Sequence, residues 1–227
     1  MIAPFSLVPV RSSNLGNMEK TEGTTPVIEE IMDLGKNSQT FPWTDYWRHS
    51  IGTAILTREI LSMTDQQFEE EADYVAGLLH NLGKLILAIT FPVLFEEIYQ
   101  NKQERSGDFL LMEKKIVGWD HAKIGAYYLW NHHISDEIVE AIHWHNEPSR
   151  AATHQHLAAA IQVADSIICG IGVMGLNRHS RETQQEHSEL EGWKILFGDK
   201  NEQEMETIEN HLESTIERVS QTLHGIL

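Results

Sequence analysis

The sequence predicts an all-α protein. Apolar residues recur three and four positions apart along most of the chain, which is the spacing of one helical face. The strict alternation of apolar and polar residues that is typical of half-buried strands is scarce. The 227 residues are 41% hydrophobic, which allows one good-sized core. We therefore expect one main helical domain.

The expected helices follow from apolar spacing and from residues that start or stop a helix. Residues 1–42 predict a short or divergent, partly irregular segment, because residues 1–25 are rich in Ser, Gly, Pro and Thr, and one short helix is expected over 27–34. Asp120 and Ser135 are expected as N-caps of the helices that follow them. The remaining helices before the C-terminal segment are expected over 44–61, 65–80, 92–98, 109–117, 121–132, 136–145 and 152–170.

These helices define a main domain over residues 43–175, and a polar loop is expected over 176–191. Residues 192–227 predict a C-terminal amphipathic helix, because apolar residues repeat every three or four positions from Met205 to Leu223 with glutamates between them. We expect this helix to pack on the same domain. The alternative use of its apolar face is a homo-oligomer contact.

Composition excludes several classes of partner. With 34 acidic and 17 basic residues the net charge is −17, which repels a nucleic-acid backbone. Cys169 is the single cysteine, so no intrachain disulfide can form and a cytoplasmic protein is expected. No apolar run is long and uninterrupted enough to predict a membrane span.

Residues 77–84 carry the most informative motif, Gly-Leu-Leu-His-Asn-Leu-Gly-Lys. It resembles the signature of the HD phosphohydrolase superfamily, in which a His-Asp pair binds divalent ions and a Lys faces a substrate phosphate. His80 and Lys84 take the family's positions, whereas Asn81 replaces the aspartate. Segments that resemble the family's other ligand-bearing helices follow in order over residues 43–170. The resemblance implies a metal-ligand set of His49, His80, Asn81, His121, His145 and Asp165.

Two segments resemble one branch of that superfamily, the HDOD domains. These are residues 119–126, Trp-Asp-His-Ala-Lys-Ile-Gly-Ala, and residues 145–148, His-Asn-Glu-Pro. Asn146 stands where the family has a second His, and the Gly-Tyr-Pro tripeptide of the related HD-GYP phosphodiesterases does not occur. HDOD domains commonly lack intact metal sites and are typical of bacterial signalling proteins. The resemblance therefore implies an HD-domain-like helical bundle that regulates rather than turns over a substrate.

The retained residues limit the metal chemistry. An aspartate offsets the charge of two cations and can bridge them, whereas the Asn81 amide is neutral and offers one weakly donating oxygen. A two-metal centre is therefore not expected. Four imidazoles and a carboxylate suit one divalent transition-metal ion such as Zn, Fe, Ni or Mn. The alternative for any single His is a locally hydrogen-bonded core or surface residue.

Neighbouring residues also have two interpretations. Lys84 contacts a substrate phosphate if the domain is active, or is a cation at a helix terminus. Three tryptophans are expected to be core aromatics beside the site, namely Trp119, Trp130 and Trp144.

Two functions follow from these residues. The first is a bacterial regulatory domain of signal transduction that binds a signalling protein or a small phosphate-containing ligand and is not an enzyme. The alternative is a metal-dependent phosphohydrolase or phosphodiesterase that acts on a nucleotide or cyclic dinucleotide through a reduced, mononuclear site. Asn81 and Asn146 favour the first, because metal-assisted hydrolysis depends strongly on ligand charge.

Overall fold

The computed structural model describes residues 41–66, 71–99, 109–173 and 186–225, and all regular structure within these ranges is helical. The predicted all-α class is confirmed. The short helix expected over 27–34 lies outside the described residues, as does most of the polar loop expected over 176–191. The described helices are α2 (Trp43–Ser62), α3 (Ala72–Leu79), α4 (Leu82–Thr90), α5 (Pro92–Tyr99), α6 (Phe109–Ile116), α7 (His121–Asn131), α8 (Asp136–Trp144), α9 (Gln155–Gly170), α10 (Glu191–Phe197) and α11 (Glu202–Gly225), with short 3-10 helices η1 (Pro148–Arg150) and η3 (His187–Glu189).

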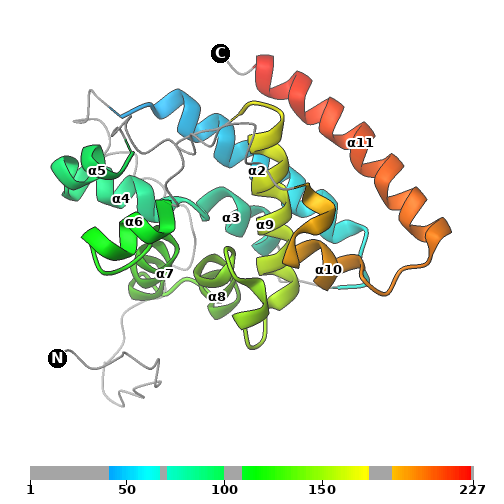
Figure 1. The fold of residues 1–227 in the computed structure, drawn as a ribbon, viewed down its shortest axis with the longest axis horizontal. Coiled ribbons are helices and arrows are strands. Elements are labelled where there is room, and N and C mark those ends of the chain that lie inside the picture. The colour runs from blue at the N-terminus through cyan, green and yellow to red at the C-terminus, as the bar shows by residue number, and fades with distance from the viewer. Residues whose placement is uncertain (1–40, 67–70, 100–108, 174–185, 226–227) are drawn as a thin grey trace, which may run out of the picture.

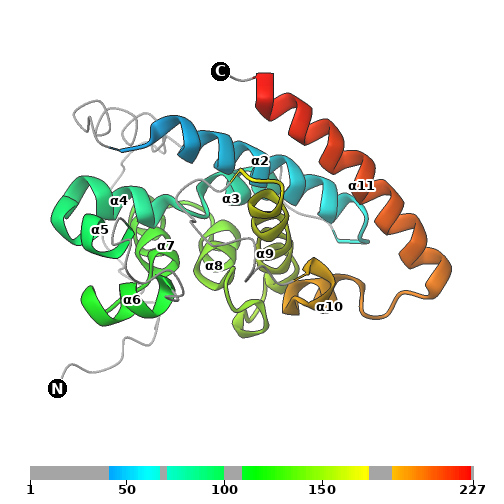
Figure 2. The ribbon, with the colours of Figure 1, turned by 45° about the horizontal axis from the view of Figure 1, so that its top comes forward.

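Helix α2 is the centre of the arrangement, with α3, α9 and α11 packed against it (Figure 1). Its inward residues include Leu56 and Ile60, which are fully buried in the core. Helices α4 to α7 gather at one end of the molecule and α9 to α11 at the other, with α8 between them (Figure 2). This layout places the middle of α2 above the ends of α3 and α8, where the sequence predicted the site.

A close backbone approach fixes α4 against α7. A Cβ atom added to Gly83 would overlap the backbone carbonyl of His121, so only glycine allows the two helices to come this near. A side chain on Gly77 would likewise lie 2.7 Å from the Cα of Ala54 on α2. These two glycines of the 77–84 motif therefore bring its His80-Asn81 turn close to both α2 and α7.

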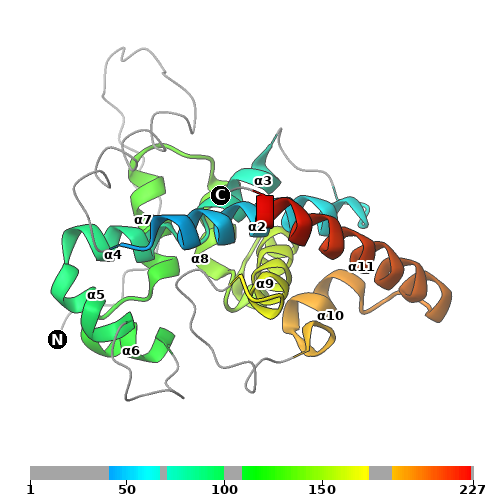
Figure 3. The same ribbon diagram turned by 90° about the horizontal axis from the view of Figure 1, so that it is seen from above.

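The C-terminal segment forms two helices, α10 and α11, where one amphipathic helix was expected over 192–227. The chain leaves the first helix at Gly198, and Asn201 caps the second by accepting from the backbone N–H groups of Gln203 and Glu204. Helix α11 lies along α2 (Figure 3). The side chains that its apolar face buries include Ile208, Leu212, Val219 and Leu223.

The expected helix starts are partly right. Asp120 caps α7 by accepting from the backbone N–H of Lys123 at 2.9 Å. Ser135 stands at the N-cap position of α8, but its buried hydroxyl has no hydrogen-bond partner among the described residues, so its predicted capping bond is wrong. None of the described helices has the length and apolar composition required to cross a membrane.

Candidate metal centre

The His80-Asn81 turn lies at the junction of two helices. His80 ends α3 and Asn81 precedes α4, so the motif presents both side chains from a tight turn rather than from a continuous helix. Both residues are buried, with 0% and 2% of their surface exposed. The apolar residues around them, Leu79 and Leu82, fill the core on either side. Packing therefore holds this turn rigidly in the interior.

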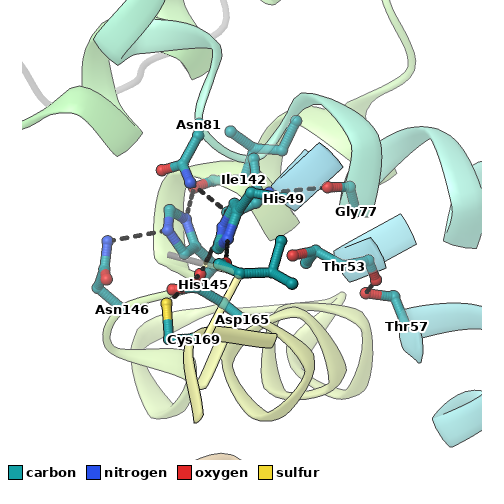
Figure 4. A network of polar contacts seen from close by, with 12 residues as sticks. His49, Thr53, Thr57, Gly77, Asn81, Ile142, His145, Asn146, Asp165 and Cys169 are labelled. Atoms are coloured by element: carbon teal, nitrogen blue, oxygen red, sulfur yellow. Dashed lines mark hydrogen bonds and ion pairs between the residues drawn. The ribbon is translucent and has the colours of Figure 1, made fainter. Parts of the chain in front are cut away.

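Four imidazoles meet at this turn. The ring centroids are 5.4 Å apart between His49 and His80, 5.4 Å between His80 and His145, and 5.5 Å between His145 and His121. The four side chains come from α2, the α3–α4 turn, the end of α8 and the start of α7 (Figure 4 labels His49 and His145). All four are buried. The structure thus brings together histidines that are up to 96 residues apart in the sequence.

Backbone carbonyls fix the tautomers of three of these rings. Nδ1 of His80 donates to the carbonyl of Gly77 at 2.7 Å, and Nδ1 of His145 donates to that of Ile142 at 2.7 Å. Nδ1 of His49 donates to the carbonyl of Val173 at 2.8 Å. Because a carbonyl can only accept, the proton must lie on Nδ1 in each case. Nε2 is then the nitrogen that faces the other histidines.

A buried carboxylate orients the fourth ring. Glu113 on α6 accepts from Nδ1 of His121 at 2.8 Å and from the backbone N–H of the same residue at 2.8 Å. Glu113 is fully buried. Carboxylate or carbonyl partners on the outer nitrogen are the usual support of metal-ligating histidines. Sequence reasoning missed Glu113, and the only signal was an acidic residue directly after the apolar run 109–112.

Helix α9 adds a carboxylate and a thiol at one end of the histidine cluster. Oδ1 of Asp165 lies 2.8 Å from Nε2 of His49 and 3.6 Å from Nε2 of His80. Sγ of Cys169 lies 3.8 Å from the same Oδ1 (Figure 4). The two residues are four positions apart on α9, so they share one face of that helix. The ligand atoms of His49, Asp165 and Cys169 all lie within 4.8 Å of one another.

These contacts set the charge of His49 and Asp165. Burial disfavours the charged form of His49 and is the largest single influence, but the hydrogen bonds and charges of Asp165 and Cys169 together outweigh it and raise the pKa of His49 to about 10. Burial tends to raise the pKa of Asp165, and the hydrogen bond from His49 and the positive charge of that ring hold the pKa well below its ordinary range. The pair is therefore an imidazolium and a carboxylate at neutral pH.

The amides that follow two of the histidines form the other end of the cluster. Nδ2 of Asn81 donates to Nε2 of His80 at 2.7 Å, and Nδ2 of Asn146 donates to Nε2 of His145 at 3.1 Å (Figure 4). Since Nδ1 carries the proton in both rings, Nε2 accepts and the amide N–H must face it. Burial lowers the pKa of His80, and lowers that of His145 well below its ordinary value. Both rings are therefore neutral.

Lys84 lies inside the same region and not on the surface. It is 3% exposed and occupies the first turn of α4. Burial lowers its pKa, while the carboxylates of Asp165 and Glu113 oppose that shift. Lys84 therefore does lie at a helix terminus, but at the N-terminal end, where the helix dipole disfavours a cation. A phosphate contact stays a prediction.

The expectation for the tryptophans is partly wrong. Trp130 is 49% exposed and lies 6.1 Å from Tyr127, measured between ring centroids, on the outer side of α7. Trp119 and Trp144 are half-buried and lie under the cations of Lys123 and Arg150 respectively. The pattern on α7 could not reveal which of its faces lacks a covering helix.

The donor set fits one metal ion and not two. A second ion would need the carboxylate that Asn81 replaces, and Nε2 of His145 already accepts from Asn146. Around Asp165, by contrast, imidazole nitrogens, an oxygen and a sulfur converge, which suits a single transition-metal ion. Oδ1 of Asn81 is a buried acceptor with no hydrogen-bond partner among the described residues, which a cation or water would satisfy. His49, His80 and Asp165 are the predicted ligands placed to hold one ion.

Comparison with solved structures supports the fold. The chain is similar to an HDOD domain protein of unknown function from Geobacter sulfurreducens, with a TM-score of 0.68, 22% sequence identity, and 85% of this chain and 66% of that chain covered. It is also similar to a protein from Marinobacter aquaeolei VT8 that is provisionally described as a signal transduction protein, with a TM-score of 0.62, 24% identity, and 86% and 43% of the two chains covered.

A curated relative is an uncharacterized protein of Treponema pallidum (strain Nichols), which is 22% identical over 123 residues. The chain spans 24% of the length of that relative, and the aligned part is 54% of this chain. A longer protein therefore surrounds the matching region in this relative.

The family model settles the resemblance. The model of the HDOD domain matches residues 24–148, which is more than half of the 227 residues. The matched region begins before residue 43, where the segments that resemble the family begin in the sequence. It ends before α9, so Asp165 and Cys169 lie outside the matched region. With the helical bundle and the ordered histidine segments, this match shows that the chain belongs to the HDOD domain family, a branch of the HD superfamily.

Proposed function

We propose that this chain is a regulatory HDOD domain of a bacterial signalling system, which acts by binding a partner and does not hydrolyse a phosphoester. The observation that carries the proposal is the pair of amide hydrogen bonds, from Asn81 to His80 and from Asn146 to His145. Each amide occupies a nitrogen lone pair that a hydrolytic HD site would use for an ion. The centre is thus closed by internal hydrogen bonds.

Burial favours a signalling protein as partner over a phosphate-containing ligand at the old cleft. The four histidine rings are at most 4% exposed, and Lys84 is 3% exposed. On the side of α4 and α7, a phosphate could reach these groups only by opening the helix packing, because the Gly83 backbone lies directly against His121. A partner protein requires no such opening. The name of the Marinobacter aquaeolei protein, which includes signal transduction, agrees with this function.

The test restores the missing carboxylate with Asn81→Asp. An anion at this position replaces the amide donor and supplies charge to a second divalent ion, so the variant should bind more Mn²⁺ per chain than the unmodified protein. Equilibrium dialysis measures the stoichiometry, and a generic phosphodiester measures hydrolysis. The unmodified protein should show no metal-dependent hydrolysis above background.

The matched control is Asn201→Asp, which places the same charge change at the N-cap of α11, far from the histidines in the fold. It should leave Mn²⁺ binding unchanged. Strong metal-dependent phosphodiesterase activity in the unmodified protein, lost in His80→Ala, would reject the regulatory proposal and support the hydrolase alternative.

A further inference from the structure

We infer that Cys169 is a metal ligand, and that with His49, Asp165 and His80 it forms a closed site for one thiophilic divalent ion of the Zn²⁺ class. The inference rests on the proposed regulatory function, because a site closed by four protein ligands serves structure or sensing and leaves no position open for a substrate. The ligand set predicted from the sequence did not include this cysteine.

Four of the six distances between the ligand atoms lie near the edges of a small tetrahedron. The group whose ligand atoms all lie within 4.8 Å of one another is His49, Asp165 and Cys169, so His80 would have to move towards the sulfur to complete the site. Bonds of about 2.0–2.1 Å to nitrogen and oxygen and about 2.3 Å to sulfur imply edges of roughly 3.3–3.6 Å. The observed separations are 3.4 Å from Nε2 of His49 to Nε2 of His80, 3.6 Å from that nitrogen of His80 to Oδ1 of Asp165, and 3.8 Å from Oδ1 to Sγ of Cys169. The 2.8 Å contact between His49 and Asp165 is shorter and would open slightly around an ion.

The charges also match. Asn81 supplies no negative charge where the superfamily has an aspartate. A Cys169 thiolate and the Asp165 carboxylate together would neutralise one divalent ion, so the thiolate restores at this end of the cluster the charge that the replacement removes. A sulfur, an oxygen and two imidazole nitrogens favour Zn²⁺ over Mg²⁺ or Ca²⁺, which prefer oxygen ligands.

The surrounding structure is already arranged for such an ion. The carbonyl of Val173 holds the outer nitrogen of His49, and that of Gly77 holds the outer nitrogen of His80, so both inner nitrogens face the centre. Asn81 is the competitor, because its amide now donates to His80. This amide must turn aside for His80 to bind, and His49 must release the Nε2 proton that it donates to Asp165. The ligand atoms of His49, Asp165 and Cys169 already lie together. The ion would link α2 to α9.

The experiment uses the full chain, stripped with a chelator and titrated with Zn²⁺ or Co²⁺. We expect one ion per chain, and in the Co²⁺ form a thiolate-to-cobalt charge-transfer band in the near ultraviolet. Cys169→Ser should abolish the band and weaken Zn²⁺ binding by more than about tenfold, since even second-shell replacements cost that much. His156→Ala, a histidine change near the start of the same helix, should leave the band and the affinity unchanged.

A second measurement does not depend on how the variant folds. In the unmodified protein, Zn²⁺ should slow alkylation of Cys169 at least about tenfold relative to Mg²⁺, because a metal-bound thiolate is withheld from the reagent. No bound ion, or a bound ion with no charge-transfer band and an unchanged alkylation rate, would overturn the assignment of Cys169. These two outcomes would leave the proposed regulatory function unaffected. That proposal fails only if the unmodified protein hydrolyses a phosphodiester.

Discussion

The two ends of the histidine cluster hold buried imidazoles in opposite ways. At the end formed by α2 and α9, Nε2 of His49 faces the Asp165 carboxylate, so the ring is protonated and its pKa is raised to about 10. At the end formed by α7 and α8, Nε2 of His145 faces an amide N–H, and burial keeps the ring neutral. Both rings anchor Nδ1 on a backbone carbonyl. The partner of the inner nitrogen therefore decides the charge.

This difference shows how an ancestral metal site can lose ions without leaving buried groups unsatisfied. An amide donor satisfies a neutral imidazole, and a carboxylate satisfies a charged one. At the amide end the carboxylate of Glu113 is already engaged by His121, whereas the carboxylate end keeps anionic and soft donors beside the inner nitrogens. We therefore expect the two ends to respond differently to mutation and pH.

The largest effect is expected for Asp165→Ala at the carboxylate end. Removing the carboxylate leaves the charged form of His49 buried without its partner, and breaking a buried pair in this way costs about 3–5 kcal/mol. Urea unfolding of the metal-free protein measures the loss. Asp45→Ala removes an exposed carboxylate 3.9 Å from Arg48 and should cost less than about 1 kcal/mol. Similar losses for the two variants would refute a stabilising buried pair.

A smaller loss is expected for Glu113→Ala at the other end. The variant leaves both Nδ1 and the backbone N–H of His121 without their acceptor, and unsatisfied buried donors cost about 1–3 kcal/mol. The same unfolding measurement applies, with the exposed neighbour Lys115→Ala as the control, expected within about 0.5 kcal/mol of the unmodified protein. A Glu113→Ala loss no larger than that of the control would show that this carboxylate does not support the ring.

Much of this arrangement could be predicted from the sequence, because the helical periodicity and the ordered histidine segments are local signals. The helix boundaries expected around Pro92 and His121 agree with α5 and α7 to within one residue at the start. The roles of Glu113 and Cys169 could not be predicted in this way. Each acts through a contact made by the fold, either across the turn between α6 and α7 or between α9 and α2.

The function of the two asparagines shows the same limit. The sequence indicates that Asn81 and Asn146 lack the charge of a metal-ligand pair, but not what their side chains do instead. Each amide donates to the ring of the residue directly before it, which requires the backbone geometry at the end of α3 and of α8. The sequence therefore reveals the change of residue type, but it does not reveal the hydrogen bond that compensates for the change.

The smallest effects are expected for pH. In the metal-free protein, His80 and His145 have lowered pKa values, so the unfolded chain binds protons more readily as the pH falls below about 6.5 and stability is lost on the acid side. His49 has a raised pKa, so its contribution is fully present below about pH 6.5 and is lost as the pH rises towards about 10. Each ring contributes at most about 1.4 kcal/mol per pH unit.

Urea unfolding between about pH 5 and 8 tests this opposition of the two ends. His49→Gln should remove the decline above pH 6.5 and keep the loss on the acid side, whereas His145→Gln should reduce the acid-side loss only. His143 and His187 add to the acid-side loss, because burial lowers their pKa values. The lowered pKa of Lys84 opposes the alkaline decline. The contribution of His49 or His145 to the pH dependence of stability is therefore the part that each variant removes. If both variants changed the same limb of the curve, the two ends would be electrostatically alike, contrary to the contacts that distinguish them.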